Sequence, residues 1–172
     1  MTNFLPDKYE VPQKSTQFMK FELGENRFRI LAKPILGSVW WVIDTDGSRK
    51  PMRVQMNVTA PVSVKSNEIK HFWAFPVFNY NVEKIQILEI TQKVIQKAIK
   101  NLFDDPDWGN PMEYDFVVTK IGQKLDTEYQ INPKPAKKLD PGIKQLFEDM
   151  SIDLTALYRG EDPFQTSEQA PF

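Results

Sequence analysis

The sequence predicts a mainly β domain with one well-defined helix in its second half. Apolar and aromatic residues recur at a period of two in several short segments, which is the spacing of a strand. Prolines, glycines and polar clusters separate these segments, as turns do between the strands of small β domains. One later segment has the spacing of an amphipathic helix. A chain of 172 residues is long enough to bury a core of its own.

Three short strands are predicted first, over 27–31, 39–43 and 52–56. In the first of them, basic and apolar residues alternate, so Arg27 and Arg29 share one face. Such a pair is equally expected on a solvated strand and beside a phosphate.

The second strand contains two adjacent tryptophans, Trp40 and Trp41, which have to point to opposite faces. One of them can join the core, whereas the other has to be covered by another element or to serve as a platform for a ligand. The alternation does not decide which is which. Arg49, Lys50 and Arg53 follow at the next strand.

The densest aromatic segment, 70–90, predicts a β-hairpin. Trp73 faces one side of its first strand, and Phe72, Phe78 and Tyr80 face the other. A strand with rings on both faces either lies between two layers or presents one face to a ligand.

The amphipathic helix is expected over 91–103, with an apolar stripe on one side and lysines on another. Two further strands are expected over 114–121 and 127–132, and the last one contains Tyr129. A shorter helix is expected over 141–150.

This order of elements predicts a five-stranded OB-fold barrel with one inserted α-helix, between the third and fourth strands, and flexible terminal extensions. A β-sandwich and an SH3-like barrel have the same periodicity and remain open. The expected organisation is an N-terminal arm over 1–16, the OB-fold domain over 17–135, a linker with a short helix over 136–159, and an acidic C-terminal tail over 160–172.

The residue types that are missing exclude several kinds of chemistry. The chain has no cysteine and one histidine, which excludes disulfides, thiolate metal sites and multi-histidine metal sites. No glycine-rich phosphate loop, nucleophile elbow or zinc-protease motif is found, so we expect no catalytic residues, no cofactor and no metal. No run of about 18 apolar residues and no signal-type segment is found, so we expect a cytoplasmic protein without a membrane partner.

Charge is divided unevenly along the chain. Residues 25–100 contain twelve lysines and arginines against six acidic residues, whereas residues 101–172 contain seven against fourteen. This asymmetry indicates a polyanion-binding region beside an acidic appendage. A fold that mixes both halves on its surface is the alternative.

Aromatic and basic residues together favour binding of single-stranded DNA, which exposes flat bases and a continuous phosphate charge. The candidate stacking rings are Trp40 or Trp41, Phe72 or Trp73, Phe78, Tyr80 and Tyr129. The candidate phosphate contacts are Arg27, Arg29, Lys33, Arg49, Lys50, Arg53 and Lys70.

Four segments resemble the single-stranded DNA-binding proteins of tailed bacteriophages: FELGENRFRILAKPILGSVWW, KHFWAFPVFNYNVEKIQILEITQKVIQKAI, PMEYDFVVTKIG and LDTEYQINP. The likeness spans about residues 17–135, and the hairpin with its helix is its most specific part. It implies an OB-fold core that coats and protects single-stranded DNA during phage DNA replication, recombination and repair in the host cytoplasm. Some relatives hold a structural zinc with Cys and His, which this chain cannot do without cysteine. The oligomeric state is left open, a homo-oligomer included.

The last residues, with Asp162, Pro171 and Phe172, are similar to the acidic tail and Pro-Phe tip of bacterial single-stranded DNA-binding proteins. This similarity implies docking of replication or recombination proteins on the tail. An acidic tail can also compete with DNA for a basic groove, so deletion of residues 160–172 is expected to raise DNA affinity at low salt.

Two other functions remain open. The aromatic hairpin could pack against a partner protein, because aromatic residues are enriched in the cores of protein interfaces. A DNA-processing enzyme is the third reading, although the sequence lacks a catalytic constellation.

Overall fold

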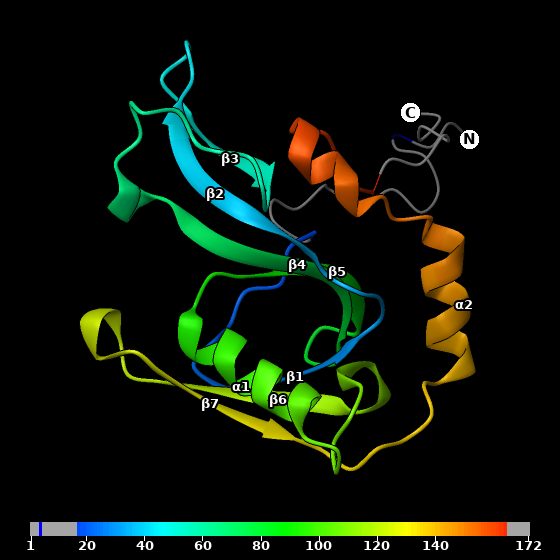
Figure 1. Ribbon diagram of the computed structural model, residues 1–172. Coiled ribbons are helices and arrows are strands. Elements are labelled where there is room, and N and C mark those ends of the chain that lie inside the picture. Colours follow the sequence, from blue (N-terminus) through cyan, green and yellow to red (C-terminus); the bar gives the residue numbers. More distant parts are fainter. Residues whose placement is uncertain (1–3, 5–16, 165–172) are drawn as a thin grey trace.

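The computed structural model describes residue 4 and residues 17–164, and within them seven strands form one antiparallel sheet (Figure 1). The strands are β1 (Gly24–Ile30), β2 (Ile35–Ile43), β3 (Arg49–Gln55), β4 (Lys70–Asn79), β5 (Lys84–Ile90), β6 (Asp115–Ile121) and β7 (Glu128–Pro133). Their order is β3-β2-β4-β1-β6-β7, and β5 pairs with the other edge of β4. The prediction of a mainly β fold is therefore confirmed.

Two α-helices and four short 3-10 turns complete the described part of the chain. The helices are α1 (Lys93–Asp104) and α2 (Pro141–Met150), and the 3-10 turns are η1 (Ser66–Glu68), η2 (Pro111–Glu113), η3 (Lys124–Asp126) and η4 (Leu154–Arg159). Both helices lie where the sequence predicts them. Among the described residues, no helix is long and apolar enough to span a membrane.

Strand β2 begins earlier than the sequence predicts, because Gly37 continues the strand instead of preceding it. At Gly37 the carbonyl oxygen of Val54 and the ring of Phe72 approach the backbone so closely that a Cβ atom would collide with both. Glycine is therefore required here for close packing of β2 against its neighbours.

Strand β4 is the centre of the sheet. It pairs with β5 along one edge, and with β2 and then β1 along the other. Within the described residues, β3 and β7 each pair on one edge only, and the outer edge of β5 meets the chain at one bridge, between Phe18 and Ile87. The expected barrel is thus not closed. Helix α1 follows β5 and contacts β7, so a helix connects these two ends of the sheet.

The two faces of β4 are covered by different layers. The inner face, which carries Trp73, Phe75 and Val77, packs against α1 in the larger core cluster. The outer face carries Phe72 and Ala74 in a second cluster. The structure thus places the first half of β4 between two layers, which is one of the two arrangements that its double-sided rings predict.

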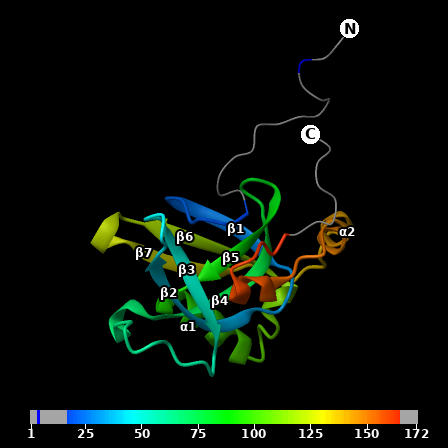
Figure 2. The same ribbon diagram turned by 90° about the horizontal axis from the view of Figure 1, so that it is seen from above.

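The layer over the outer face comes from the C-terminal segment. Seen from above, η4 lies over β4 and β5, between β3 and α2 (Figure 2). Leu157 is buried in the second cluster, and the hydroxyl of Tyr158 donates to the carbonyl of Leu36 at 2.6 Å. Residues 152–164 therefore form part of the folded domain.

This layer includes residues that the sequence assigns to the acidic tail. Pro163 is buried, its carbonyl accepts from the amide of Asp153 at 2.9 Å, and the amide of Glu161 donates to the carbonyl of Ala156. The packed segment thus extends at least to Phe164. The expected arm over 1–16, apart from Phe4, and the end of the expected tail lie outside the described residues.

Candidate nucleic-acid interface

Strand register divides the candidate residues between the two faces of the sheet. Residues that pair directly in an antiparallel sheet point to the same side, and alternation extends this along each strand. The outer face carries Arg27, Arg29, Trp41, Arg49, Arg53, Lys70, Phe72, Phe78 and Tyr80. The inner face carries Trp40, Lys50, Trp73 and Tyr129, and Lys33 lies in the β1–β2 connection. Most candidates thus share one face.

The structure shows which ring of each adjacent pair is exposed and which is buried. Trp41 is 56% exposed and Trp40 is 4% exposed. Phe72 is fully buried beneath the C-terminal layer, while Trp73 is half-buried on the inner face. Trp40 and Phe72 therefore offer no surface to a base, and they serve as core residues.

Arg29 is buried as well, so it is not a phosphate contact. Its Nε donates to the carbonyl of Met112 and its Nη2 to the carbonyl of Lys137, both at 2.9 Å. Its Nη1 lies 3.7 Å from the Asp115 carboxylate, which supplies the counter-charge that a buried guanidinium requires.

Asp115 is the centre of an ionic cluster at this end of the outer face. Its buried carboxylate accepts from Arg27 Nη2 at 2.9 Å and from the Tyr80 hydroxyl at 3.1 Å, and it lies 3.1 Å from Lys137 Nζ. We call Asp115, Arg27, Arg29, Tyr80 and Lys137 the Asp115 cluster. It ties β1, β6 and the end of β4 to the chain that leads to α2.

The cluster also changes the acidity of its members. Burial by itself raises the pKa of Asp115, but hydrogen bonds from Arg27, Lys137 and Tyr80, with the Lys137 charge, outweigh it and hold the pKa below its usual value. Burial and the Asp115 charge raise the pKa of Tyr80 to about 12. Tyr80 therefore remains a protonated donor to the carboxylate at neutral pH.

Tyr80 has little free ring surface for stacking. The Arg27 guanidinium and the Lys137 ammonium each lie 5.6 Å from its ring centre, and the Phe78 ring meets it edge-on at 5.1 Å. Phe78 is half-buried in this contact. The sequence predicts that these rings and Arg27 contact DNA; in the structure Arg27 and Tyr80 bind Asp115, and Phe78 packs against Tyr80.

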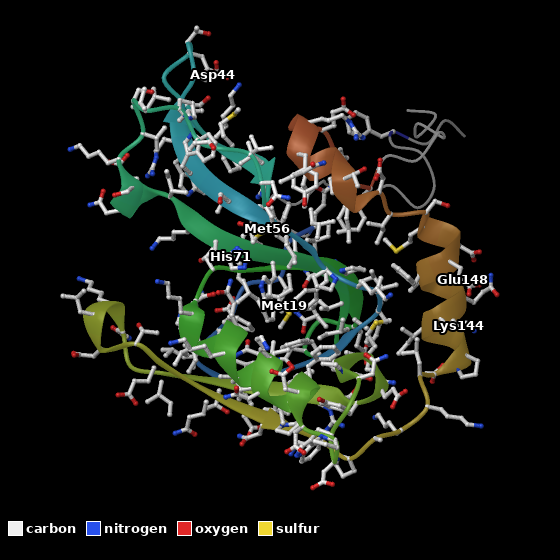
Figure 3. All side chains as sticks on the ribbon, in the orientation of Figure 1. Met19, Asp44, Met56, His71, Lys144 and Glu148 are labelled. Carbon is white, nitrogen blue, oxygen red and sulfur yellow. The ribbon has the colours of Figure 1, made fainter. Side chains whose placement is uncertain are left out.

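Three other candidates are also engaged within the protein. Arg53 Nε lies 2.5 Å from the Glu89 carboxylate, and its guanidinium lies 5.8 Å from the centre of the Phe18 ring. The Tyr129 ring packs against Phe21 at the margin of the inner core, with centroids 5.8 Å apart. Lys50 pairs with Asp44 at 3.3 Å, near the tip of the β2–β3 hairpin (Figure 3 labels Asp44).

The remaining outer-face candidates are Trp41 of β2, Arg49 of β3 and Lys70 of β4. Together with Ile43 of β2 they form a surface that we call the hairpin face. The Arg49 guanidinium lies 5.4 Å from the centre of the Trp41 ring. Val39, the next residue on this face, pairs with Lys70 of β4. Within the described residues, the side chain of Lys70 has no hydrogen bond or ion pair, so the hairpin face combines a half-exposed indole, next to the Arg49 guanidinium, with available positive charge.

His71 is a polar contact that the candidate set omits. Its Nε2 accepts from the Trp73 indole at 3.1 Å, and its Nδ1 lies 2.9 Å from the Gly37 carbonyl. Because an indole nitrogen only donates, Nε2 of His71 is the acceptor in the contact with Trp73. Alternation alone places His71 and Trp73 on the same face, so the sequence contains a signal for this pair (Figure 3 labels His71).

The described part of the tail makes one long-range polar contact. The Asp162 carboxylate accepts from the Gln17 side-chain amide at 3.3 Å and from the backbone amide of Phe164 at 2.9 Å. Pro171 and Phe172 lie outside the described residues. Among the described residues, no three His, Cys, Asp or Glu side chains gather closely enough to hold a metal ion.

Comparison of the chain with protein-family models, curated proteins and solved structures finds no match. Function is therefore inferred from the arrangement of side chains.

Proposed function

We propose that this protein is a non-enzymatic single-stranded DNA-binding protein that coats and protects single strands during replication, recombination and repair. The observation that carries the proposal is the hairpin face, where the Arg49 guanidinium lies 5.4 Å from the centre of the half-exposed Trp41 ring and Lys70 pairs with Val39, the preceding residue of β2 on the same face. The resemblance to phage single-stranded DNA-binding proteins points to the same function, in the cytoplasm of a phage host. Recruitment of replication proteins through Asp162, Pro171 and Phe172 is part of the same proposal.

A half-exposed indole beside two cations suits a sequence-tolerant contact. Every base has a flat face that can stack on Trp41, at about 1–3 kcal/mol per base, and Arg49 and Lys70 can neutralise adjoining phosphates. One ring and two cations make a small site, so a single chain is expected to bind weakly. Coating of a strand then requires several copies side by side.

The strand pairings support an OB-type topology, which we include in the proposal. Strands β1, β4 and β5 then correspond to the first three barrel strands, α1 to the inserted helix, and β6 and β7 to the last two strands. The β2–β3 hairpin becomes an insertion between the first and second strands. In OB folds the loop at that position binds oligonucleotides, which fits a DNA contact at Trp41.

Titration of the full chain with oligo(dT) at low salt tests this function. Binding is expected to quench tryptophan fluorescence, and Trp41→Ala is expected to remove most of the quenching and weaken binding by about 5- to 150-fold, as loss of one stacked base predicts. Trp108→Phe serves as the control, because Trp108 contacts Tyr114 beyond the end of α1. Equal oligo(dT) affinity in the native chain and Trp41→Ala would reject the hairpin face as the DNA site.

Protein binding is the second candidate, and exposed apolar side chains on the same hairpin favour it. Ile43, Met52, Met56 and Val58 are exposed on β2, β3 and the residues that follow (Figure 3 labels Met56). Such side chains often mark contacts with other proteins. The 70–90 hairpin, first expected to form this contact, is largely buried, so the β2–β3 hairpin is the better location. Absence of oligo(dT) binding at low salt would favour this alternative.

A further inference from the structure

A cavity of about 680 Å³ lies on the inner side of the sheet, opposite the hairpin face. Ile99 and Phe103 of α1 form one wall, and Trp73 and Phe75 of β4 form another. The β1–β2 connection, with Leu36, and the residues around η2 enclose the remaining sides. This volume lies within the range of about 300–1,000 Å³ that is typical of small-molecule sites.

The walls of the cavity are held in place by hydrogen bonds. The indole of Trp73 donates to His71 at 3.1 Å, and His71 in turn contacts the Gly37 carbonyl at 2.9 Å. On the opposite wall, the Asn110 side chain accepts from the amide of Met112 at 3.0 Å, which caps η2. These contacts fix the orientation of the Trp73 ring and of η2 at the margin of the cavity.

The chemistry of the lining is apolar with positive charge and no carboxylate. Lys33 and Lys100 are its two charged residues. Lys33 is exposed and has no hydrogen bond or ion pair within the described part of the chain, whereas Lys100 lies 2.6 Å from Asp104. Leu36 and Phe103 remain exposed, so apolar surface is still open to a ligand. This lining complements an anion with an apolar body.

A nucleotide fits the lining poorly. Its base carries polar groups along one edge, and apart from the two lysines the lining offers Asn110 as its only polar side chain. Polar groups that are buried without partners destabilise a complex. Rings or methylene chains without polar groups can enter this cavity without the free-energy cost of burying an unpaired hydrogen-bonding group.

We propose that the cavity binds a small amphipathic anion, with rings or methylene groups against Trp73 and α1 and one carboxylate, sulfonate or phosphate beside Lys33. Lys100, the other charged residue of the lining, is already paired with Asp104, so Lys33 is the main anion contact. This site is independent of the hairpin face, because Trp41 projects from the other side of the sheet.

Titration of the full chain with 8-anilinonaphthalene-1-sulfonate, an aromatic sulfonate that fluoresces in apolar surroundings, tests the proposal. Saturable binding at one site is expected, with displacement by decanoate and much weaker displacement by decanol. Ala32→Trp, which fills the cavity from the β1–β2 connection, is expected to reduce the affinity at least tenfold. Lys33→Glu is expected to reduce it several-fold, and Lys138→Glu, which alters an exposed lysine outside the lining, is expected to leave it unchanged.

Three results would overturn the proposal. These are the absence of saturable binding to the native chain, undiminished binding by a folded Ala32→Trp variant, and displacement by thymidine monophosphate as effective as by decanoate. Because Lys33→Glu alters an exposed side chain, it tests the charge contact even if Ala32→Trp fails to fold. Oligo(dT) affinity is expected to remain unchanged in Ala32→Trp, which separates this proposal from the DNA-binding function.

Discussion

At Asp115, one carboxylate without exposed surface receives contacts from two arginines, a lysine and a tyrosine. Each of the two arginines, taken alone, is a reasonable phosphate contact. In the structure both arginines instead lie beside the buried carboxylate and stabilise the fold. A charge that is removed from water requires opposite charges and hydrogen bonds around it. Asp115 of β6 thus accounts for the positions of the basic and aromatic residues at this end of the sheet, which the sequence predicts as DNA contacts.

Replacement of Asp115 by Asn is expected to destabilise the protein strongly. The change leaves the buried Arg29 without a counter-charge, which typically costs about 3–5 kcal/mol. Urea unfolding measures the loss. Asp104→Asn, which breaks the exposed pair with Lys100, is the matched control and is expected to change the unfolding free energy by less than about 1 kcal/mol. Similar small losses in both variants would show that the Asp115 cluster is not a major source of stability.

The same residue predicts a pH dependence. The pKa of Asp115 in the folded protein is lowered below the value of about 3.9 in an unfolded chain, so its ionised form stabilises the fold. That stabilisation is complete above the unfolded-state pKa and is lost as the pH falls below it, through the folded-state pKa. Unfolding free energies measured from pH 6 down to pH 2 are expected to fall less steeply in Asp115→Asn than in the native chain. Parallel profiles for the two proteins would contradict the assignment.

At the scale of elements, β4 explains why the aromatic hairpin is central and yet mostly unavailable to a ligand. Its inner face meets α1, and its outer face meets η4 and the residues on both sides of it. Both layers are apolar, so the rings of the first half of β4 pack inside the protein and offer little surface to a ligand. The exposed ring, Trp41, lies farther along β2, past Val39, which belongs to the cluster that the C-terminal layer covers.

The C-terminal layer is expected to contribute to stability in the way that a core element does. Leu157 is 4% exposed in the cluster that covers Phe72, so Leu157→Ala is expected to cost about 2–5 kcal/mol through lost burial and a residual cavity. Leu125→Ala is the control, because Leu125 on η3 is fully exposed. Thermal unfolding is expected to show a large loss of stability for the first variant and almost none for the second. An equally small effect of Leu157→Ala would show that the layer is dispensable.

This packing also changes how the tail hypothesis is tested. Deletion of residues 160–172 removes Pro163, which is buried, and it therefore disturbs the outer layer together with the tail. Deletion of residues 165–172 leaves that layer in place. Any gain in DNA affinity at low salt from the shorter deletion can then be assigned to the tail.

At the scale of the whole molecule, the hairpin face, the C-terminal layer and the cavity occupy separate parts of the surface. The β2–β3 hairpin projects from one end of the sheet, and α2 lies at the other end (Figures 1 and 2). The cavity opens on the face opposite Trp41. Substitutions in the hairpin face and in the cavity are therefore expected to leave each other unaffected, whereas the C-terminal layer contacts Val39 and, through Tyr158, the carbonyl of Leu36.

The proposed DNA contact at the hairpin face predicts which lysines affect the salt dependence of binding. Lys70→Glu is expected to weaken oligo(dT) binding and to reduce the slope of log affinity against log salt by about 0.7, the loss of one phosphate contact. Lys144→Glu, on α2 at the other end of the molecule, changes the net charge equally and is expected to leave the slope unchanged (Figure 3). Equal effects of the two variants would indicate attraction by overall charge without a contact at the hairpin face.

The sequence by itself determines the elements of this protein and the faces of its strands. Alternation identifies the strands, and it places Trp40 and Trp41 on opposite sides, because these properties depend on neighbouring residues alone. It also anticipates that β4 lies between two layers or presents one face to a ligand.

Only the tertiary structure decides which faces are covered. Burial of Phe72 depends on η4, where Tyr158 bonds to Leu36 across 122 positions of the chain, and burial of Arg29 depends on Asp115 and on the carbonyl of Lys137. The open sheet likewise depends on how α1 meets β7. Local periodicity carries no information about such long-range contacts, since the free energy of burying a side chain is set by whichever distant segment covers it.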